Sequence, residues 1–363
     1  MIVRDEAATI GAVLADAGQF CDELIVLDTG SVDETVEIAR AGGATVHEFV
    51  WIDDFAAARN ASFAHCTGDW ILWLDADDRV PAAAQAGFRD LKNELRGRHD
   101  LDGIMVPYHR GFAASDPSIC TFSFDRERVL RRSAGLRWEC AVHEVIGLRH
   151  DRSIRWPDAF VEHRPPVESL ERKSHRNIRI LEGMVGSGDR SPRTLFYYGN
   201  ELREHGRHEE ALAVYGEYIE RGTLGWERYS ALLHMATCCD ELDRHEEKVQ
   251  HLLAAVHFDS ARAEAFNRLG MHFYDRKEWR RAIAFFGGAS VVERPNEGFI
   301  NDSDYADLPL DYLAVCLSHL GRDREALEYT LRAIVTAPDR ERLLTNVDYY
   351  RARLAAHGDE QKP

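Results

Sequence analysis

The chain has 363 residues and a formal net charge of −17 at pH 7, with 45% hydrophobic and 29% charged residues. This length accommodates two domains with cores of their own, and the composition is that of an ordinary globular protein. The negative charge disfavours non-specific attraction to nucleic acid phosphates and anionic membranes, so neither is an expected partner. The seven cysteines form no C-x-x-C pair, which favours reduced thiols over a disulfide framework or a structural zinc site.

The sequence predicts neither a targeting segment nor a membrane-spanning segment. The start, MIVRDEAATI, lacks a basic segment followed by a long apolar run, and therefore predicts no secretory signal. No stretch reaches the roughly 18 consecutive apolar residues of a membrane span. Together with the cysteine pattern, this predicts a cytoplasmic protein.

The first part of the chain alternates short apolar strands with amphipathic helices. Strands are expected at 1–3, 23–28, 44–50 and 70–75, and helices at 6–21, 31–43 and 55–68. This βαβαβ order predicts a mostly parallel sheet with helices on both faces, whose ligands bind at the carboxyl ends of the strands. Two later stretches, 102–112 and 121–132, are predicted to be more antiparallel strands.

A cluster of acids follows the last of these strands. The apolar run WILWL leads directly into Asp75, Asp77 and Asp78. A turn that only ends a strand needs one Asp or Gly, whereas neighbouring carboxylates repel one another. Magnesium and manganese bind oxygen ligands, commonly one or two carboxylates together with substrate phosphates. The stretch therefore favours a divalent metal site of the Asp-x-Asp (DXD) type, with a solvated strand-end loop as the alternative.

From about residue 168 the sequence becomes all-helical and repetitive. A small residue recurs at Ala211, Ala282 and Ala326, and Lys248 takes the equivalent place in a degenerate second unit. A period of about 34 residues, with a turn before a charged helix start, is typical of tetratricopeptide repeats, whose helix pairs stack into one domain. The longer step before Ala326 predicts an insert at 296–309.

Four motifs occur in order along the first part: MIVRDE, VLDTGSVDET, FAAARNAS and GDWILWLDADD. In this order the chain resembles glycosyltransferase family 2, whose catalytic domain has the nucleotide-sugar-binding fold called GT-A. The resemblance covers roughly residues 1–165. It is closest to members with an appended tetratricopeptide domain, which include bacterial peptide S-glycosyltransferases and lipopolysaccharide-core glucosyltransferases. Several apolar residues usually precede the first motif there, so either the first strand is short here or the chain begins at an internal methionine.

The resemblance implies an α/β GT-A domain, with a mostly parallel sheet and flanking helices, followed by an all-α tetratricopeptide-like domain. The expected boundaries are 1–167 for the GT-A domain, 168–191 for a connecting helix, 192–350 for the repeats and 351–363 for a C-terminal tail. A homodimer through the repeat domain is a further arrangement that such repeats allow.

The resemblance also implies which residues bind the donor, a UDP-sugar. The implied nucleotide-pocket residues are Val3, Arg4, Asp5, Asp28, Arg59 and Asn60. Asp28 would lie near the uracil, and Arg59 and Asn60 would shape the pocket beneath the nucleotide. The alternative for Arg59 is an ion pair on a helix surface.

The metal shell is implied in the same way. Asp77 would ligate Mn²⁺ or Mg²⁺, and Asp75 would face the ribose or a metal-bound water. His163, in VEHRP, would match the histidine that completes the metal shell in many GT-A enzymes, with a structural histidine as the alternative. Asp78 has no firm role, because the family varies at this position.

Family 2 enzymes invert the anomeric carbon, and therefore need a base to deprotonate the acceptor. Related enzymes carry this acid on a segment after the Asp-x-Asp motif, where VHE stands here. Glu144 is thus the expected base, with His143 as the alternative. The family usually has a Glu-Asp pair at this point, so the His-Glu pair is a departure.

The sequence therefore predicts an inverting, metal-dependent transferase. It would move a hexose or N-acetylhexosamine from a UDP-sugar to a Ser, Thr or Cys side chain of a peptide or protein that the repeats recruit. One alternative is a saccharide acceptor, such as lipopolysaccharide core or capsule, and another is a modified nucleic-acid base, which the net charge disfavours. A non-catalytic scaffold is disfavoured by the intact DADD, DTGS and ARN motifs.

Overall fold

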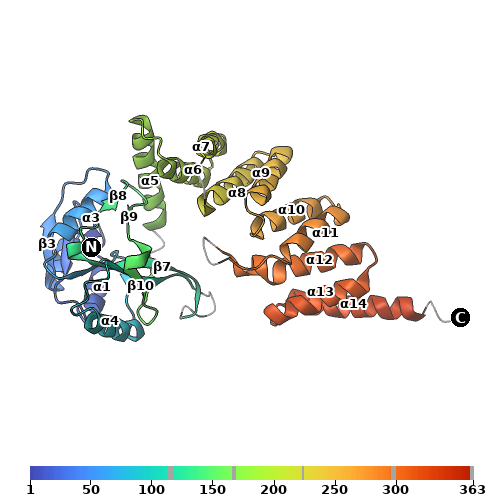
Figure 1. The fold of residues 1–363 in the computed structure, drawn as a ribbon, viewed down its shortest axis with the longest axis horizontal. Helices are drawn as coiled ribbons and strands as arrows, with labels where there is room; N and C mark the ends of the chain where they lie inside the picture. Colours follow the sequence, from blue (N-terminus) through green and yellow to red (C-terminus); the bar gives the residue numbers. More distant parts are fainter. Residues whose placement is uncertain (113–115, 117, 166–168, 223–224, 296–299, 360–363) are drawn as a thin grey trace. The chain divides into compact units, whose positions relative to one another are not determined.

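The computed structural model describes residues 1–112, 116, 118–165, 169–222, 225–295 and 300–359 (Figure 1). The chain divides into two compact units, Met1–Gly188 and Asp189–Pro363. The first contains strands and helices, and the described part of the second contains helices alone. This confirms the predicted order of an α/β domain and an all-α domain. The predicted boundary at 167/168 and residues 296–299 of the predicted insert lie outside the described residues.

The N-terminal part of the first unit has the predicted βαβαβ order. Its strands are β1 (Ile2–Val3), β2 (Ile25–Asp28) and β3 (Thr45–Glu48), which pair in parallel in the order β1-β2-β3. The helices are α1 (Ile10–Ala17), α2 (Thr35–Ala41) and α3 (Phe55–Ala64). Helix α3 begins after Asp54, whose carboxylate caps it by accepting a hydrogen bond of 2.8 Å from the backbone N–H of Ala57.

A second sheet has six strands. They are β4 (Trp70–Leu72), β5 (Asp78–Arg79), β6 (Gly103–Phe112), β7 (Cys120–Arg131), β10 (Ser153–Arg155) and β11 (Val161–His163). The order is β4-β7-β6-β11-β5, with β10 paired to β6. Strands β6 and β7 form the antiparallel pair expected at 102–112 and 121–132, whereas β10 and β11 run parallel to β6. This second sheet is therefore mixed. The strand predicted at 70–75 within the parallel sheet is β4, which lies in this mixed sheet and pairs antiparallel with β7, so its expected place beside the first three strands is wrong.

The remaining elements of the first unit surround these sheets. They are α4 (Ala82–Glu94), η1 (Arg132–Ala134), the hairpin of β8 (Trp138–Glu139) and β9 (Val145–Ile146), η2 (His150–Arg152) and α5 (Ser169–Gly186). Helix α5 is tied to the loop before α3, because both guanidinium nitrogens of Arg179 donate to the carboxylate of Asp53 at 2.7 and 2.6 Å. The long helix that the sequence predicts as a connection thus packs on the α/β unit.

The second unit is a series of antiparallel helices (Figure 1). Its described helices are α6 (Pro192–Glu204), α7 (His208–Glu220), α8 (Trp226–Glu241), α9 (His245–Phe258), α10 (Glu264–Asp275), α11 (Trp279–Ala289), η3 (Asp302–Tyr305), α12 (Asp307–His319), α13 (Asp323–Thr336) and α14 (Glu341–Asp359). Ala211, Ala282 and Ala326 are fully buried, as the repeat pattern requires. Lys248, the exception, forms an ion pair of 2.7 Å with Asp240. Helix α14 runs to Asp359, over most of the stretch expected to be a tail.

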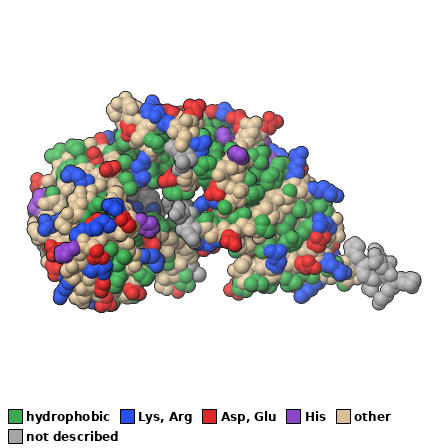
Figure 2. Space-filling view, in the orientation of Figure 1, with side chains coloured by type: hydrophobic (Ala, Val, Ile, Leu, Met, Phe, Trp, Pro, Cys, Tyr) green, Lys and Arg blue, Asp and Glu red, His purple; other side chains and the backbone are tan. Residues whose placement is uncertain are grey.

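Two properties of the surface bear on partners. No helix in the described ranges is long and apolar enough to cross a membrane. On the face shown in Figure 2, acidic and basic side chains lie interspersed over each unit.

Candidate functional site

The acidic turn lies between β4 and β5 and is held by backbone hydrogen bonds. The N–H of Asp78 donates to the carbonyl of Asp75 at 3.1 Å, which closes the turn. The N–H of Arg164 donates to the carbonyl of Asp77 at 2.9 Å, and His163 pairs with Asp78 across the β5–β11 ladder. Pairing between strands far apart in sequence thus brings His163 beside the aspartates.

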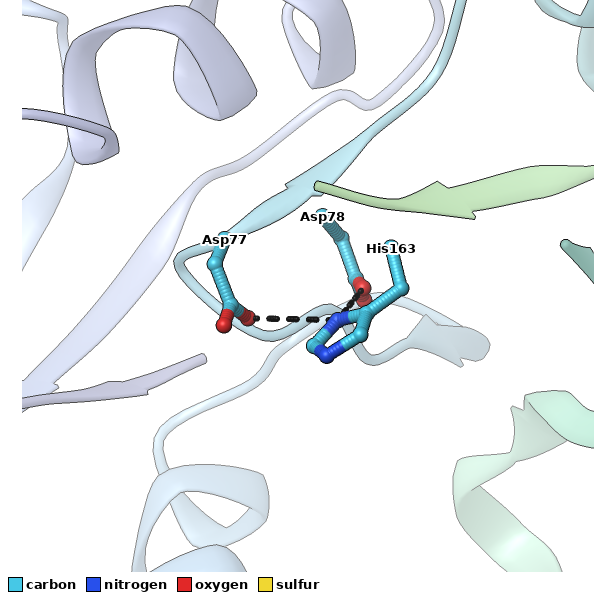
Figure 3. A group of neighbouring side chains, drawn as sticks. All are labelled: Asp77, Asp78 and His163. Atoms are coloured by element: carbon cyan, nitrogen blue, oxygen red, sulfur yellow. Dashed lines mark ion pairs between the residues drawn. The ribbon is translucent and has the colours of Figure 1, made fainter. Parts of the chain in front are cut away.

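Asp77, Asp78 and His163 converge at the end of this turn (Figure 3). The Nδ1 atom of His163 lies 3.6 Å from Oδ1 of Asp77 and 3.5 Å from Oδ1 of Asp78. Two ligands of one Mg²⁺, each about 2.1 Å from the ion in an octahedral shell, stand about 3.0 to about 4.2 Å apart. Nδ1 of His163 is also buried without a hydrogen-bond partner in the described chain. The carboxylate oxygens here suit Mg²⁺ or Mn²⁺, and the imidazole nitrogen is a ligand that transition-metal cations accept.

Asp75 is directed elsewhere. Its Oδ1 accepts a hydrogen bond of 2.8 Å from Nη2 of Arg59 on α3, and it does not belong to the converging group. Burial raises the pKa of Asp75, but the charges of Arg59 and then Arg128 outweigh burial and hold this pKa well below its ordinary value. Asp75 is therefore an ionised carboxylate that pairs with an arginine.

Arg59 connects Asp75 with the predicted base. Its Nε donates a hydrogen bond of 2.5 Å to Oε1 of Glu144, and its guanidinium lies over the indole rings of Trp73 and Trp138, 4.7 and 5.3 Å from their centroids. Only 8% of Arg59 is exposed. A buried, stacked and doubly paired arginine fixes the positions of both carboxylates. The helix-surface alternative for Arg59 is thus wrong.

The hairpin that presents Glu144 is fastened to α3 by Asn60. Nδ2 of Asn60 donates to the carbonyl of Trp138, and its Oδ1 accepts from the N–H of Trp138, both at 2.9 Å. In the turn of this hairpin, Cys140 and His143 have positive φ angles of 71° and 52°, which non-glycine residues adopt rarely. Such backbone strain clusters at functional sites. Asn60 therefore acts through the hairpin, and His143 lies in its strained turn beside Glu144.

Asp5 and Asp28 organise the loops after β1 and β2. The carboxylate of Asp28 accepts from the N–H groups of Gly30 and Ser31 at 3.1 and 3.2 Å, a turn for which Gly30 supplies a φ of 102°. Oδ1 of Asp5 accepts from the N–H of Val32 at 2.8 Å, and the N–H of Asp5 donates to Oγ of Ser31 at 2.9 Å. The two loops expected to bind the nucleotide are thus joined to each other.

Val3 lies in the core, whereas the side chain of Arg4 lies at the surface. Val3 is 4% exposed, and its carbonyl accepts a hydrogen bond of 2.9 Å from the hydroxyl of Thr29. Arg4 exposes 53% of its side chain and stands 3.9 Å from Asp5. Arg4 can therefore contact a ligand with its side chain, whereas Val3 contributes to the shape of the loop.

A cleft of about 450 Å³ opens beside the acids. It is lined by Ala8, Thr9, Ala12, Asp77, Asp78, Arg79, Pro81, Glu162 and Arg164. Its volume is within the range of small-molecule sites. The converging carboxylates therefore adjoin a space large enough for part of a ligand.

Two residues at this site carry no signal in the sequence. Nη1 of Arg128 forms an ion pair of 3.0 Å with Oδ2 of Asp78, and both side chains are fully buried. The hydroxyl of Tyr108 donates a hydrogen bond of 2.9 Å to Oδ1 of the same carboxylate. Arg128 stands in the charged run DRER, and only the register of β7 distinguishes it from its neighbours.

Part of the chain is similar to known proteins. Residues 1–84 match the model of the family described as Glycosyl transferase family 2. A tetratricopeptide repeat-containing protein of Synechococcus elongatus is 34% identical over 178 residues, which are 45% of this chain and 40% of that protein. The glycosyltransferase SunS, from the SPbeta prophage of Bacillus subtilis, is 24% identical over 244 residues, which are 64% of this chain and 54% of SunS. The chain thus spans about half the length of these curated relatives.

Among solved structures, the chain resembles MamA, with a TM-score of 0.39 and 15% sequence identity over 48% of this chain and 94% of that one. It also resembles YrrB, described as a tetratricopeptide protein, with a TM-score of 0.37 and 15% identity over 49% and 84% of the two chains. The repeat assignment depends instead on the series of helices in the second unit and on the buried small residues Ala211, Ala282 and Ala326. Residues 1–84 thus carry the glycosyltransferase family 2 match, and the second unit is a helical region of the tetratricopeptide-repeat type.

Proposed function

We propose that this protein is an inverting, metal-dependent glycosyltransferase that moves a sugar from a UDP-sugar to a side chain of a peptide or protein. The match of residues 1–84 to glycosyltransferase family 2 carries this proposal, because that stretch contains Asp28, Arg59, Asp75 and Asp77. The convergence of Asp77 with His163 supports it independently, since His163 lies outside the matched stretch.

The donor would bind at the carboxyl ends of β1, β2 and β4. The joined loops at Asp5 and Asp28 would receive the nucleoside, and the cleft beside Asp77 would receive the diphosphate. Asp77 and His163 would hold a Mn²⁺ or Mg²⁺ ion, which neutralises the charge that develops on the departing nucleoside diphosphate. Asp75, fixed by Arg59, would accept hydrogen bonds from the ribose hydroxyls.

Glu144 would remove the proton of the acceptor. One of its oxygens is held by Arg59, and only 13% of the side chain is exposed. Its second oxygen makes no hydrogen bond to the described residues and can accept a proton, while the charge of Arg176 on α5 also acts on this carboxylate. Inversion requires this base on the face of the sugar opposite the diphosphate, and general base catalysis commonly contributes about 10²- to 10⁴-fold to rate.

The acceptor is assigned from the repeat region. Stacked helical repeats form extended surfaces that suit an extended peptide chain. A Ser, Thr or Cys side chain would be the nucleophile, and Cys would need the least help from the base because its thiol is the most acidic of the three.

A two-part experiment tests this function. The full chain is incubated with Mn²⁺, UDP-glucose or UDP-N-acetylglucosamine, and a peptide library containing Ser, Thr and Cys, and mass spectrometry locates the added sugar. Proton NMR then reads the anomeric configuration of the product. A β-linked sugar on a peptide side chain is expected from these α-configured donors, whereas an α-linked product would contradict inversion.

The same incubation, repeated with lipopolysaccharide core saccharide or with nucleic acid in place of the peptides, discriminates the other acceptors. Glycosylation of a lipopolysaccharide core saccharide, without modification of any peptide or protein, would replace the peptide assignment with a saccharide one. Modification of nucleic acid bases alone would replace the peptide assignment with a nucleic-acid acceptor. Absence of any donor turnover would leave the scaffold alternative.

A further inference from the structure

We propose that helices α6, α8 and α10 of the second unit form a docking surface for an acidic peptide, whose carboxylates pair with Arg203 and Arg268. The inference rests on the proposed peptide acceptor and deepens it, because it states which peptides the repeats recruit. The three helices are the first members of successive helix pairs along this unit (Figure 1). The docking surface consists of Arg203 on α6, His234 on α8 and Arg268 on α10.

The hydroxyl of Tyr215 on α7 joins the first two of these helices. It donates a hydrogen bond of 2.6 Å to Oδ1 of Asn200 on α6 and lies 3.3 Å from Nδ1 of His234 on α8. Because Asn200 engages the one hydroxyl proton, Nδ1 of His234 is the atom that donates to the Tyr215 oxygen. Arg203 follows Asn200 by three residues on the same helix, and its charge acts on the same hydroxyl. Arg203 and His234 are therefore neighbours across the contact of α6 with α8.

Arg268 is fixed on α8 close to His234. Its Nη1 donates hydrogen bonds to the carbonyl of Leu233 at 3.0 Å and to Oγ1 of Thr237 at 3.1 Å. Leu233 precedes His234 directly, and Thr237 follows it by three residues on the same helix. Burial, and then the charges of Arg203 and Arg268, lowers the pKa of His234 to about 3. His234 is therefore uncharged at neutral pH and separates two cations.

The described residues offer these two arginines little negative charge. Arg203 forms one ion pair, of 3.1 Å with Glu204, whose side chain is 56% exposed, and an exposed pair of this kind contributes little. Nε of Arg203 is buried without a hydrogen-bond partner in the described chain. Arg268 is exposed and forms no ion pair with any residue that the structure describes. Both guanidinium groups can therefore bind a further carboxylate.

Two carboxylates act on Arg268 from a distance, and both are engaged by other groups. The charges of Asp304 and Glu264 reach Arg268 without forming an ion pair in the described chain. Oδ1 of Asp304 accepts a hydrogen bond of 3.0 Å from Nδ2 of Asn267. Oε2 of Glu264 accepts one of 2.8 Å from the hydroxyl of Tyr305. These contacts hold the two acids within the repeats, so neither replaces the carboxylate of a ligand at Nε or Nη2 of Arg268.

An extended acidic peptide matches this surface. Guanidinium groups bind carboxylates through paired, charge-assisted hydrogen bonds, so arginine is well suited to Asp and Glu side chains. A carboxylate near both arginines would also offset the repulsion between Arg203 and Arg268. Stacked repeats present successive helices to one extended chain. The net charge of −17 repels acidic chains from the rest of the protein, so these two cations would select where such a peptide binds.

Fluorescence anisotropy tests the docking surface in the full chain, without metal or sugar donor. The probe is a labelled, C-terminally amidated peptide of alternating Ser and Glu, and its twin carries Gln in place of Glu. Wild type should bind the Ser-Glu peptide at least about tenfold more tightly than the Ser-Gln peptide. R203M/R268M should bind the Ser-Glu peptide at least about tenfold more weakly than wild type, because both partners of the carboxylates are removed.

Two further variants separate local pairing from net charge and from folding. R280M/R324M is the matched control, since it removes two exposed arginines from α11 and α13, and its affinity for the Ser-Glu peptide should stay within about twofold of wild type. R268M alone changes an exposed side chain, so it should unfold near the wild-type temperature and still weaken binding at least about threefold. This single variant keeps the result readable if the double variant does not fold.

Three outcomes would overturn the proposal. The first is equal affinity of wild type for the Ser-Glu and Ser-Gln peptides. The second is a folded R268M or R203M/R268M variant that binds the Ser-Glu peptide no more weakly than R280M/R324M does. The third is preferential binding of a single-stranded oligonucleotide that R203M/R268M weakens, which would make nucleic acid the partner.

The proposed function is judged separately, by sugar transfer to peptides. Any of the three outcomes, together with transfer to peptides, would remove the docking surface and leave the transferase in place. Binding of the Ser-Glu peptide by a chain that transfers no sugar to any peptide would remove the peptide acceptor and keep the docking surface.

Discussion

Nε of Arg59 donates a hydrogen bond of 2.5 Å to Oε1 of Glu144, although 85 residues separate them in the sequence. The same guanidinium holds Asp75 through Nη2. The proposed base and the carboxylate expected at the ribose are thus set by one buried side chain of α3. A change at Arg59 should therefore affect donor binding and acceptor deprotonation together.

Replacement of Arg59 by methionine tests this coupling. R59M retains most of the side-chain volume but leaves Asp75 and Glu144 without their shared partner. We expect kcat/KM for sugar transfer to fall by about 10²- to 10³-fold, the size of effect seen when one preorganised hydrogen-bond donor is removed from an active site. Steady-state kinetics measure this loss. A similar loss in R40M, an exposed arginine of α2, would show that the effect is not specific to Arg59.

The role of Glu144 is tested by E144Q, which keeps the shape of the side chain but cannot accept a proton. We expect kcat to fall by about 10²- to 10⁴-fold, with the KM for the UDP-sugar nearly unchanged. E139Q, an exposed glutamate of the same hairpin, is the control and should retain wild-type kcat. Full activity in E144Q, together with a comparable loss in H143Q, would transfer the role of base to His143.

We expect Asn60 to stabilise the protein by holding the β8–β9 hairpin against α3. N60A removes two hydrogen bonds of 2.9 Å to the backbone of Trp138 and leaves buried backbone groups unpaired. This should cost about 2 kcal/mol of stability and lower the unfolding temperature by about 4 to about 8 °C. Differential scanning calorimetry measures the shift. An unchanged unfolding temperature would mean that the hairpin is held by packing alone.

The ion pair of Asp75 with Arg59 predicts that the stability of the protein depends on pH in the acidic range. Burial raises its pKa, but Arg59 and Arg128 outweigh burial and leave the folded-state pKa below the ordinary value of about 3.9. The folded chain therefore releases this proton more readily than the unfolded chain, so the stabilisation is present above the ordinary pKa and is lost as the pH falls through the lower folded-state value. Wild type should lose unfolding temperature more steeply than D75N below about pH 4. Parallel curves for the two proteins would contradict the pairing with Arg59.

Much of the acidic turn could be predicted from the sequence, because the residues that form it lie next to one another in the chain. The apolar run WILWL predicts a buried strand, and the aspartates Asp75, Asp77 and Asp78 that follow it favour a divalent metal site. The pairing of Arg59 with Glu144 could not be predicted from local pattern, because it depends on how the β8–β9 hairpin lies over α3. The motif order indicated a role for each residue but no contact between them.

The burial of Arg128 could not be predicted from the local sequence either. Asp125, Arg126, Glu127 and Arg128 are consecutive charged residues, and a strand alternation over them assigns no face to the core. Arg128 falls at a register shift of the β6–β7 pair, between the pairings of Val129 with Ile104 and of Glu127 with Met105, and it is fully buried whereas Arg126 is partly exposed. In the repeat region the opposite holds, because the small residues at Ala211, Ala282 and Ala326 already mark the buried face.

Release of UDP from a UDP-sugar in the presence of Mn²⁺ tests the central claim most directly. Wild type, D77N and D69N are compared, because Asp69 is an exposed aspartate at the other end of the same strand. The proposed site predicts Mn²⁺-dependent release by wild type and D69N that is lost on chelation of the metal, and almost none by D77N. Equal release by D77N and wild type would contradict a metal-dependent glycosyltransferase centred on Asp77.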